Sequence, residues 1–365
     1  MTDGSRLLQL LLQVSEKAAN IARTCRQNET LFKLLVQEKS EEEKNPRFFH
    51  DFKTLADVLI QETIKHDIGL EFPELVEAVK GEESNVFSNT LGETIIVNVC
   101  SSLNETADLL SKVLGDDKEA ASLLALEVHK DITMSDVPVD SNLPKDLDLH
   151  INDLGIWIDP IDSTADYINA IEKVDEETGI HLSGLRCVTV LIGVYLQSTG
   201  LPVLGVVNQP FYINKDSQWQ GTCYWGYSNN GTNKCSLGGA TKPGNVILLS
   251  QSENPDIKCN LKKGGFSLIE ATGAGYKILS VATGQADAYI LSKSSTYRWD
   301  TCGPQAVLHS LGGGLINFSE FSKHSKSSDT FLTYSTEGKD FSNKDGFIAY
   351  RDTQILETLS LVLSS

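Results

Sequence analysis

The 365-residue sequence lacks several features that mark well-defined protein classes. Its seven cysteines include no C-x-x-C pair and are odd in number, which disfavours a disulfide framework or a zinc site and predicts reduced thiols. Neither an internal repeat nor a low-complexity tract is present. Basic residues are few, 31 against 49 acidic ones, and the formal net charge is −18. That charge disfavours non-specific binding to nucleic acid or to anionic membranes.

Long hydrophobic runs are also missing. The leucine-rich residues 7–12 are interrupted by Gln9 and followed by Glu16 and Lys17, so they are too short for a membrane span and lack a signal-peptide layout. Their helical spacing predicts an amphipathic helix packed on the core. With 40% hydrophobic residues, the chain can form one large or two coupled domains. We therefore expect a globular cytoplasmic protein.

What the sequence does contain is the octapeptide W-I-D-P-I-D-S-T at residues 157–164. Apolar residues before it indicate the end of a buried strand, and Pro160 bends the chain there. In such a bend Asp159, Asp162 and the carbonyl of Ile161 can face one cation. Hard oxygen ligands of this kind suit Mg²⁺, which in enzymes usually also contacts a substrate phosphate.

The end of the octapeptide adds an anion site to this interpretation. Ser163 and Thr164 stand at the expected start of a helix, whose free N–H groups favour a bound anion. The alternative is a capped turn whose carboxylates only accept bonds from backbone donors. Asp166, two residues on, is either solvated or biases the choice of substrate.

Two further acidic clusters favour the metal interpretation. G-E-E-S at residues 81–84 follows a predicted helix, and W-D-T-C-G-P at residues 299–304 precedes another, with Pro304 expected in its first turn. Asp300 would then lie beside a helix N-terminus, which stabilises a carboxylate. Each cluster alone is most often a solvated surface or a cap. Three of them at the ends of strands or helices favour a site for two or three Mg²⁺ ions.

Together these motifs resemble those of the Mg²⁺-dependent, Li⁺-sensitive phosphomonoesterases of the inositol monophosphatase family. The resemblance runs from about Lys53 to the C-terminal helix. The segments most similar to the inositol polyphosphate-hydrolysing members are K-T-L-A-D at 53–57, G-E-E-S-N at 81–85, C-Y-W-G at 223–226 and G-A-G-Y-K at 273–277.

The resemblance implies an activity. It is hydrolysis of the 1-phosphate of inositol 1,4-bisphosphate and inositol 1,3,4-trisphosphate by a metal-activated water, with Li⁺ as an inhibitor. Bisphosphate nucleotidases share K-T-x-A-D and G-A-G-x-K, so 3′-phosphoadenosine 5′-phosphate is the alternative substrate. A different class of alternative is a catalytically silent inositol-phosphate-binding protein. We expect a small-molecule substrate, no nucleic-acid or membrane partner, and a monomer.

The resemblance also implies roles for individual residues. The positions that match the family's Mg²⁺ ligands are Glu82, Asp159, Ile161 through its carbonyl, Asp162 and Asp300. The positions that match the family's water-orienting residues are Asp57, Glu82 and Thr164. The positions that match substrate-binding residues are Asp162, Ser163, Thr164, Ser252, Gly273, Ala274 and Lys277.

The glycine-rich segment 273–277 also has an interpretation of its own. Its turn offers backbone N–H groups to an anion, and Lys277 could meet a second phosphate as a point charge. One alternative is a turn with a solvated lysine. The other is a dinucleotide-binding fingerprint, which the absence of a third glycine disfavours. His309 and Cys302 are expected to pack in the core rather than to act in catalysis.

The resemblance implies an α/β fold with alternating helical and sheet layers, a five-layer αβαβα sandwich. An N-terminal portion (1–185) and a C-terminal portion (186–365) would enclose the site. Periodicity and turn residues predict helices at about 5–38, 50–66, 104–114, 117–129, 275–283, 302–311 and 353–364. They predict strands at about 93–100, 154–159, 186–196, 202–208, 220–227, 245–249, 286–291, 314–317 and 346–350, and a loop or lid at 130–152.

Overall fold

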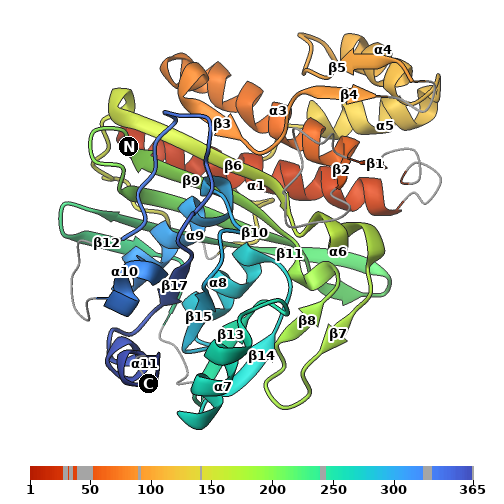
Figure 1. Ribbon diagram of the computed structural model, residues 1–365. Helices are drawn as coiled ribbons and strands as arrows, with labels where there is room; N and C mark the ends of the chain where they lie inside the picture. The colour runs from red at the N-terminus through yellow and green to blue at the C-terminus, as the bar shows by residue number, and fades with distance from the viewer. Residues whose placement is uncertain are drawn as a thin grey trace.

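The computed structural model describes residues 1–27, 32, 36–38, 52–88, 92–139, 142–238, 244–323 and 331–363. Helices and sheets are stacked in five alternating layers, beginning and ending with helices (Figure 1). The expected αβαβα sandwich is therefore confirmed. None of the described helices has the length and apolarity needed to span a membrane.

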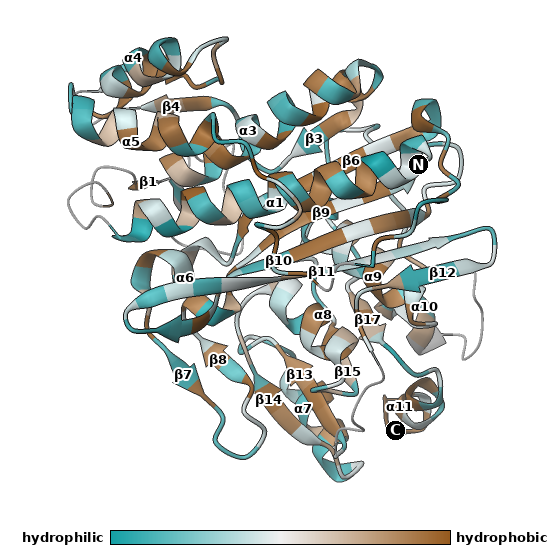
Figure 2. Ribbon diagram, turned by 180° about the vertical axis from the view of Figure 1, so that it is seen from behind, coloured by the Kyte–Doolittle hydropathy of each residue, from teal (hydrophilic) through white to brown (hydrophobic). Residues whose placement is uncertain are grey.

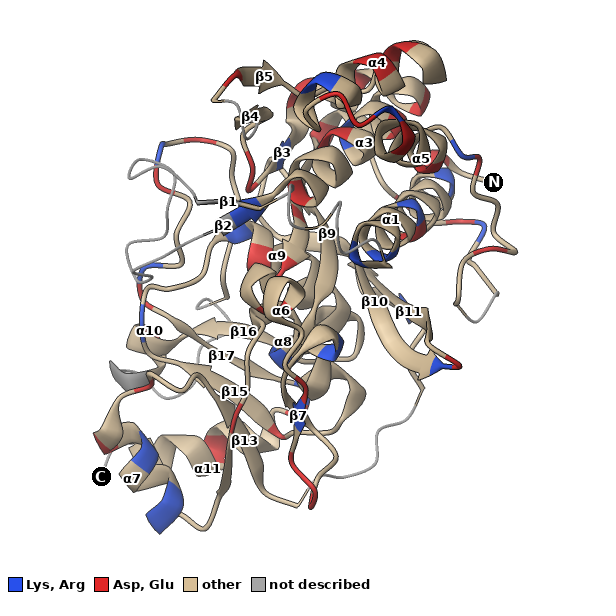
Figure 3. Cartoon of the chain, turned by 90° about the vertical axis from the view of Figure 1, so that its right-hand side faces the viewer, with Lys and Arg blue, Asp and Glu red and all other residues tan. Residues whose placement is uncertain are grey.

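The first layer is helical and covers the outer face of the first sheet. Its helices are α1 (Asp3–Gln27), α3 (Leu55–Glu71), α4 (Leu103–Val113) and α5 (Lys118–Val128). One face of α1, including Leu8 and Leu11, is fully buried, as expected for a core-packed amphipathic helix (Figure 2). Acidic and basic residues are interspersed on the outer surface of this layer (Figure 3).

The second layer is a sheet with the strand order β12-β11-β10-β9-β6-β3 among the described residues. Its strands are β3 (Val79–Gly81), β6 (Leu154–Asp162), β9 (Thr189–Leu196), β10 (Pro202–Lys215), β11 (Gln218–Asn229) and β12 (Thr232–Cys235). The short β3 runs parallel to β6, with Gly81 opposite Ile158, whereas β6 and β9 are antiparallel. The carboxyl ends of β3 and β6 therefore lie side by side.

The central layer consists of α8 (Ala274–Thr283) and α9 (Arg298–Ser310), which pack on each other between the two sheets. Glycines allow α9 to approach the first sheet closely. A Cβ atom added to Gly193 would lie 2.3 Å from the amide nitrogen of Gly303, and one added to Gly205 would lie 2.1 Å from the Gly303 carbonyl oxygen. Backbone thus meets backbone where α9 crosses β9 and β10.

The fourth and fifth layers complete the stack. The second sheet has the order β14-β13-β15-β17-β16, with strands β13 (Val246–Leu249), β14 (Ser267–Glu270), β15 (Ala288–Leu291), β16 (Gly314–Asn317) and β17 (Phe347–Tyr350). The outer helices are α7 (Pro255–Lys263), α10 (Phe318–Lys323) and α11 (Gln354–Leu363). Parallel pairing of β13 with β14 and β15 places their carboxyl ends at one edge of this sheet.

Smaller elements fill the connections. They are the paired strands β1 (Val36–Glu38) with β2 (Phe52–Thr54), β4 (Val86–Ser88) with β5 (Thr94–Ile96) and β7 (Lys173–Val174) with β8 (His181–Ser183), the short helix α6 (Thr164–Asn169), and the 3₁₀ turns η1 (Pro73–Ala78), η2 (Ile151–Asp153) and η3 (Leu185–Cys187).

Most of the predicted elements exist, and several boundaries were wrong. The first helix ends at Gln27, and residues 36–38, predicted as its end, form β1. The strand predicted at 93–100 is limited to β5, and the helix predicted to begin at residue 50 begins at Leu55. Parts of the first two predicted helices and residue 364 of the last lie outside the described residues.

Pro304 was wrongly placed in the first turn of its helix. α9 begins at Arg298, so Pro304 lies inside it and removes the helical hydrogen bond to the carbonyl of Asp300. Residues 132–139 and 142–150 form a loop, as predicted. The amide of Cys223 donates to the carbonyl of Pro138, and the hydroxyl of Tyr227 donates to the carbonyl of Asp148. These bonds hold the loop against β11.

The proposed division at residue 185 stays a prediction. The first sheet takes β3 and β6 from one side of that position and β9 to β12 from the other.

Candidate active site

Two aspartates stand at the irregular end of β6. The pairing of β6 with β9 shifts register between Asp159 and Asp162, which is where Pro160 interrupts the ladder. Both aspartates are buried. Because β3 ends beside β6, Glu82 directly follows a neighbouring strand, and its amide donates to the carbonyl of Ile158 at 3.2 Å.

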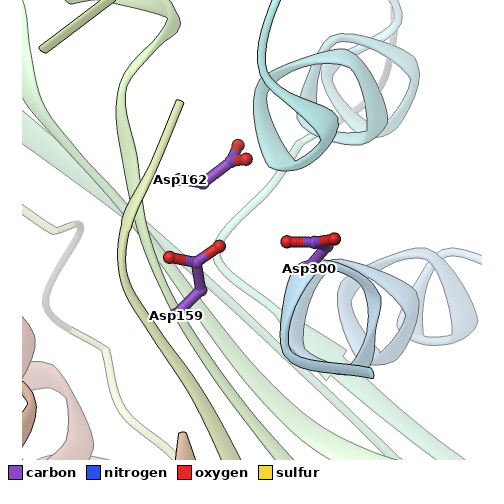
Figure 4. Close-up of side chains that lie close together, drawn as sticks. All are labelled: Asp159, Asp162 and Asp300. Carbon is purple, nitrogen blue, oxygen red and sulfur yellow. The ribbon is translucent and has the colours of Figure 1, made fainter. Parts of the chain in front are cut away.

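Asp300 reaches the same place from α9. It occupies the first turn of that helix, where its Oδ2 accepts a 2.7 Å hydrogen bond from the amide of Tyr297. One carboxylate oxygen from each of Asp159, Asp162 and Asp300 lies within 4.8 Å of the others. Figure 4 shows the three side chains pointing toward a common centre. The close packing of α9 on the first sheet is what makes this convergence possible.

The carboxyl groups of this cluster affect one another's pKa values. Burial raises the pKa of Asp159 well above its usual value, and the neighbouring Glu82, Asp162 and Asp300 raise it further. Burial, Asp162 and Glu82 raise the pKa of Asp300 in the same way. Burial raises the pKa of Asp162 to about 6, against an opposing effect of Lys277. Like charges held together in a low-dielectric site repel unless protons or metal ions neutralise them.

The donor set fits Mg²⁺. Mg²⁺ is held in proteins by one or two carboxylates, retained waters and substrate phosphate oxygens, and the convergent groups here are all carboxylates. The carbonyl of Ile161, the remaining predicted ligand, accepts a 3.1 Å hydrogen bond from the hydroxyl of Thr164. The structure therefore brings three of the predicted metal-binding side chains together, places Glu82 beside them, and leaves their roles as ligands a prediction.

Asp57 lies at the start of α3 and is buried. Its Oδ2 accepts hydrogen bonds from the amide and the hydroxyl of Thr54, each at 2.6 Å, and its own amide donates to the Thr54 hydroxyl. Asp57 thus forms a capping box. The neighbouring Lys53 is 1% exposed, and its Nζ donates to the Ser84 hydroxyl and the Val86 carbonyl. The 53–57 segment therefore contacts the loop that carries Glu82.

Ser163, directly before the first residue of α6, has an unusual backbone conformation. Ser163 has φ = 71°, which is uncommon for a residue other than glycine. Its hydroxyl donates to Oδ2 of Asp166 at 2.5 Å, while Oδ1 of Asp166 accepts from the amide of Gly184 at 2.8 Å. Asp166 is buried, so it is a local structural group rather than the solvated side chain considered above.

The glycine-rich turn faces the metal cluster. The amides of Ala274 and Gly275 donate to the carboxylate of Asp162 at 3.3 and 2.8 Å, and Thr189 donates to it at 3.1 Å. Gly273 has φ = 70°, and a Cβ there would lie 2.7 Å from the carbonyl oxygen of Cys187. A glycine is therefore required at this turn.

Lys277 is buried rather than solvated. It is 4% exposed, its Nζ donates to the carbonyl of Ala271 at 2.9 Å, and it lies 4.9 Å from the centre of the Tyr289 ring. Ser252 follows β13 at the edge of the second sheet, and its carbonyl accepts a hydrogen bond from Lys293. Contact of Lys277 and Ser252 with substrate stays a prediction.

His309 and Cys302 pack as expected. Burial lowers the pKa of His309 to about 4, and its ring meets Phe331 edge-on. Cys302 is fully buried, and burial raises its thiol pKa well above the usual value. His309 is thus partly buried and Cys302 fully buried, in agreement with packing roles.

Sequence reasoning missed two residues that contact this site. Thr189, at the start of β9, lies opposite Asp162 on the neighbouring strand, and its hydroxyl donates to the Asp162 carboxylate. Nothing local in the sequence marks it. Gln61 lies on α3 and is fully buried, with both ends of its amide bonded to Glu83. It stands four residues after Asp57 and thus on the same helical face, which is the signal that could have identified it.

Comparison with known proteins agrees with this geometry. A sequence model of the inositol monophosphatase family matches residues 113–354. The chain is 44% identical over 397 residues to the inositol polyphosphate 1-phosphatase of Homo sapiens, covering 99% of this chain and 98% of the relative. It is 28% identical over 250 residues to the 3′(2′),5′-bisphosphate nucleotidase 1 of Dictyostelium discoideum, covering 65% and 73%. The extragenic suppressor protein suhB of Bartonella henselae matches the fold with a TM-score of 0.56 at 16% identity, covering 99% of each chain.

Proposed function

Because the chain belongs to the inositol monophosphatase family, we propose that it is a Mg²⁺-dependent phosphomonoesterase acting on inositol polyphosphates. The substrates would be inositol 1,4-bisphosphate and inositol 1,3,4-trisphosphate, each losing its 1-phosphate. The observation that carries the proposal is the convergence of Asp159, Asp162 and Asp300, which each place one carboxylate oxygen within 4.8 Å of the others. The 44% identity to a curated inositol polyphosphate 1-phosphatase over almost the whole chain supports the choice of substrate.

Glu82, Asp159, the Ile161 carbonyl, Asp162 and Asp300 would hold two or three Mg²⁺ ions. Bound Mg²⁺ supplies polarisation of the phosphoryl oxygens, acidification of a water molecule and stabilisation of the leaving alkoxide. The bond broken is the ester P–O bond, and water supplies the hydroxyl group of the released phosphate.

The protein's own groups then position the reactants. We assign Glu82 and the hydroxyl of Thr164 to orientation of the attacking water, and Asp57 to support of the same water from the start of α3. The backbone around Ser163, kept at φ = 71° by the bond to Asp166, would receive the transferred phosphoryl group. Ser252, the 273–274 turn and Lys277 would line the side that carries the inositol ring and its distal phosphate.

Two alternatives differ in substrate or in class. A nucleotidase would use the same metal centre on 3′-phosphoadenosine 5′-phosphate, but similarity to the nucleotidase is 28% identity over 65% of the chain. A catalytically silent binder would not need the full acidic cluster, and Asp159, Asp162 and Asp300 are all present and convergent. We further infer inhibition by Li⁺, a cytoplasmic monomer, and a site enclosed between residues 1–185 and 186–365.

The deciding experiment measures phosphate release with Mg²⁺, with and without Li⁺. The substrates to compare are inositol 1,4-bisphosphate, inositol 1-phosphate and 3′-phosphoadenosine 5′-phosphate. We expect preference for the inositol bisphosphate and loss of that activity with Li⁺. Preference for the nucleotide would transfer the assignment to the nucleotidase, and no release from any of the three would favour the silent binder.

A further inference from the structure

Gln61 on α3 makes a two-point contact with the backbone beyond β3. Its Nε2 donates to the carbonyl of Glu83 at 2.5 Å, and its Oε1 accepts from the amide of Glu83 at 2.9 Å. The side chain is fully buried. One amide group therefore provides both the donor and the acceptor that a neighbouring strand would provide.

This contact begins where the sheet stops. β3 ends at Gly81, and the amide of Glu82 still donates to Ile158 of β6. The next residue, Glu83, forms its backbone bonds with Gln61 instead. Glu82 is thus fixed on one side by the strand β6 and on the other by the helix α3.

The space for this arrangement is tight. A Cβ atom added to Gly81 would lie 2.0 Å from Oε1 of Gln61 and 2.6 Å from its Cδ. The Gln61 amide therefore lies directly against the end of β3, and only glycine at position 81 leaves room for it. Leaving a buried donor or acceptor without its partner lowers the stability of the protein. The two bonds from Gln61 therefore fix the position of the loop relative to α3.

Glu82 lies next to the acidic cluster, because its amide donates to the carbonyl of Ile158, the residue that precedes Asp159 on β6. We propose that Gln61 is a positioning residue that fixes the backbone beside Glu82 and so holds the Glu82 carboxylate at the metal centre. The inference rests on the proposed metal-dependent function. It adds a residue that neither the sequence motifs nor the carboxylate cluster assigns, and it connects α3, which also carries Asp57, to the loop that carries Glu82.

The test measures Mn²⁺ binding to the full chain without substrate, by the electron paramagnetic resonance signal of free Mn²⁺. Gln61→Leu removes both bonds to Glu83 and keeps an apolar side chain in the buried space. Partners that orient metal ligands typically change metal affinity about 10- to 100-fold when removed. We expect the Mn²⁺ dissociation constant of Gln61→Leu to rise by about tenfold or more, with phosphate release recovering as Mg²⁺ is raised.

The matched control is Thr63→Val on the same helix. Thr63 is also fully buried, and its hydroxyl donates to the carbonyl of Leu59 within α3, so its removal costs a buried hydrogen bond without touching the loop. We expect Thr63→Val to lower the melting temperature in EDTA and to bind Mn²⁺ like the wild type. Loss of affinity in both variants to the same extent would make the effect one of general stability and overturn the proposal.

The outcomes separate this proposal from the proposed function. A wild-type protein that binds no Mn²⁺ overturns both. If the wild type binds Mn²⁺ and a folded Gln61→Leu variant has a dissociation constant within twofold of the wild-type value, only the role of Gln61 is overturned. Where Gln61→Leu does not fold, Gln61→Glu decides, because it keeps the acceptor for the Glu83 amide and loses the donor to its carbonyl. Unchanged affinity in Gln61→Glu then contradicts the proposal.

Discussion

At the scale of single residues, the site depends on carboxylates placed where their charge is unfavourable. Asp159 and Asp162 are 1% and 7% exposed, and each has a raised pKa. Buried charges of one sign are tolerated when a cation or a proton compensates them. Residues of this kind are retained for chemistry, since apolar residues of similar size would stabilise the fold more.

Asp300→Asn should separate activity from folding. The asparagine oxygen can still accept the hydrogen bond from the Tyr297 amide, whereas the negative charge is lost. We expect phosphate release to fall by more than about 100-fold, because removing a ligand should exceed the cost of removing a supporting partner. Melting temperature in EDTA should stay equal or rise. The control is Asp131→Asn, on the surface, and near-normal activity of Asp300→Asn with Mg²⁺ would refute the assignment of this ligand.

At the scale of elements, the site is an intersection of β3, β6 and α9. The parallel pairing of β3 with β6 places Glu82 beside Asp159, and the crossing of α9 over β9 and β10 supplies Asp300. That crossing relies on glycine, because the backbone of Gly303 lies directly over Gly193 and Gly205. The absence of side chains at these three glycines lets helix and sheet meet backbone to backbone, and this close approach determines where Asp300 lies.

Gly205→Ala should disturb this crossing. The added methyl group would lie 2.1 Å from the Gly303 carbonyl oxygen, and backbone has to move to relieve the overlap. Overpacking of this kind costs typically about 1–3 kcal/mol, and we expect that loss in urea unfolding, together with a higher Mg²⁺ requirement. Gly238→Ala, where an added Cβ meets nothing within 4 Å, is the control. A Gly205→Ala protein with unchanged stability would show that α9 can shift without cost.

At the scale of the whole molecule, the metal should couple folding to pH. The raised pKa of Asp162, about 6 against 3.8, means that the metal-free folded protein holds a proton that the unfolded chain has already lost. The free energy of unfolding without metal should therefore fall as pH rises from about 4 to 6, and further where Asp159 and Asp300 ionise. We expect bound Mg²⁺ to remove this penalty by neutralising the carboxylates.

The stabilisation by Mg²⁺ should consequently increase with pH. Melting temperatures measured in EDTA and in saturating Mg²⁺ should differ more near pH 8 than near pH 5, where Mg²⁺ competes with protons for the same oxygens. Asp300→Asn should reduce both the difference and its dependence on pH. An equal shift in melting temperature at both pH values would contradict the link between the cluster and the metal.

Some elements that were not predicted nevertheless have recognisable signals in the local sequence. Helix α7 has Asn254 at its N-cap, Pro255 at its first position and Gly264 after its end, which is a recognisable helix pattern. The strand β4 and the pair β7–β8 are different, because each of these strands has two or three residues. Strands that short have no periodicity to detect, and the surrounding packing decides whether they form.

By itself, the sequence determined the chemistry of this protein. The octapeptide at 157–164 and the acidic clusters at 81–84 and 299–304 predict oxygen ligands at chain bends, because residue type and turn geometry are local properties. Only the tertiary structure decided which carboxylates meet and what holds them. Asp300 is 138 positions beyond Asp162 in the sequence, and Gln61 reaches Glu83 from another layer. Such contacts depend on strand register and on the distance between helix and sheet, which are settled by packing across the whole molecule.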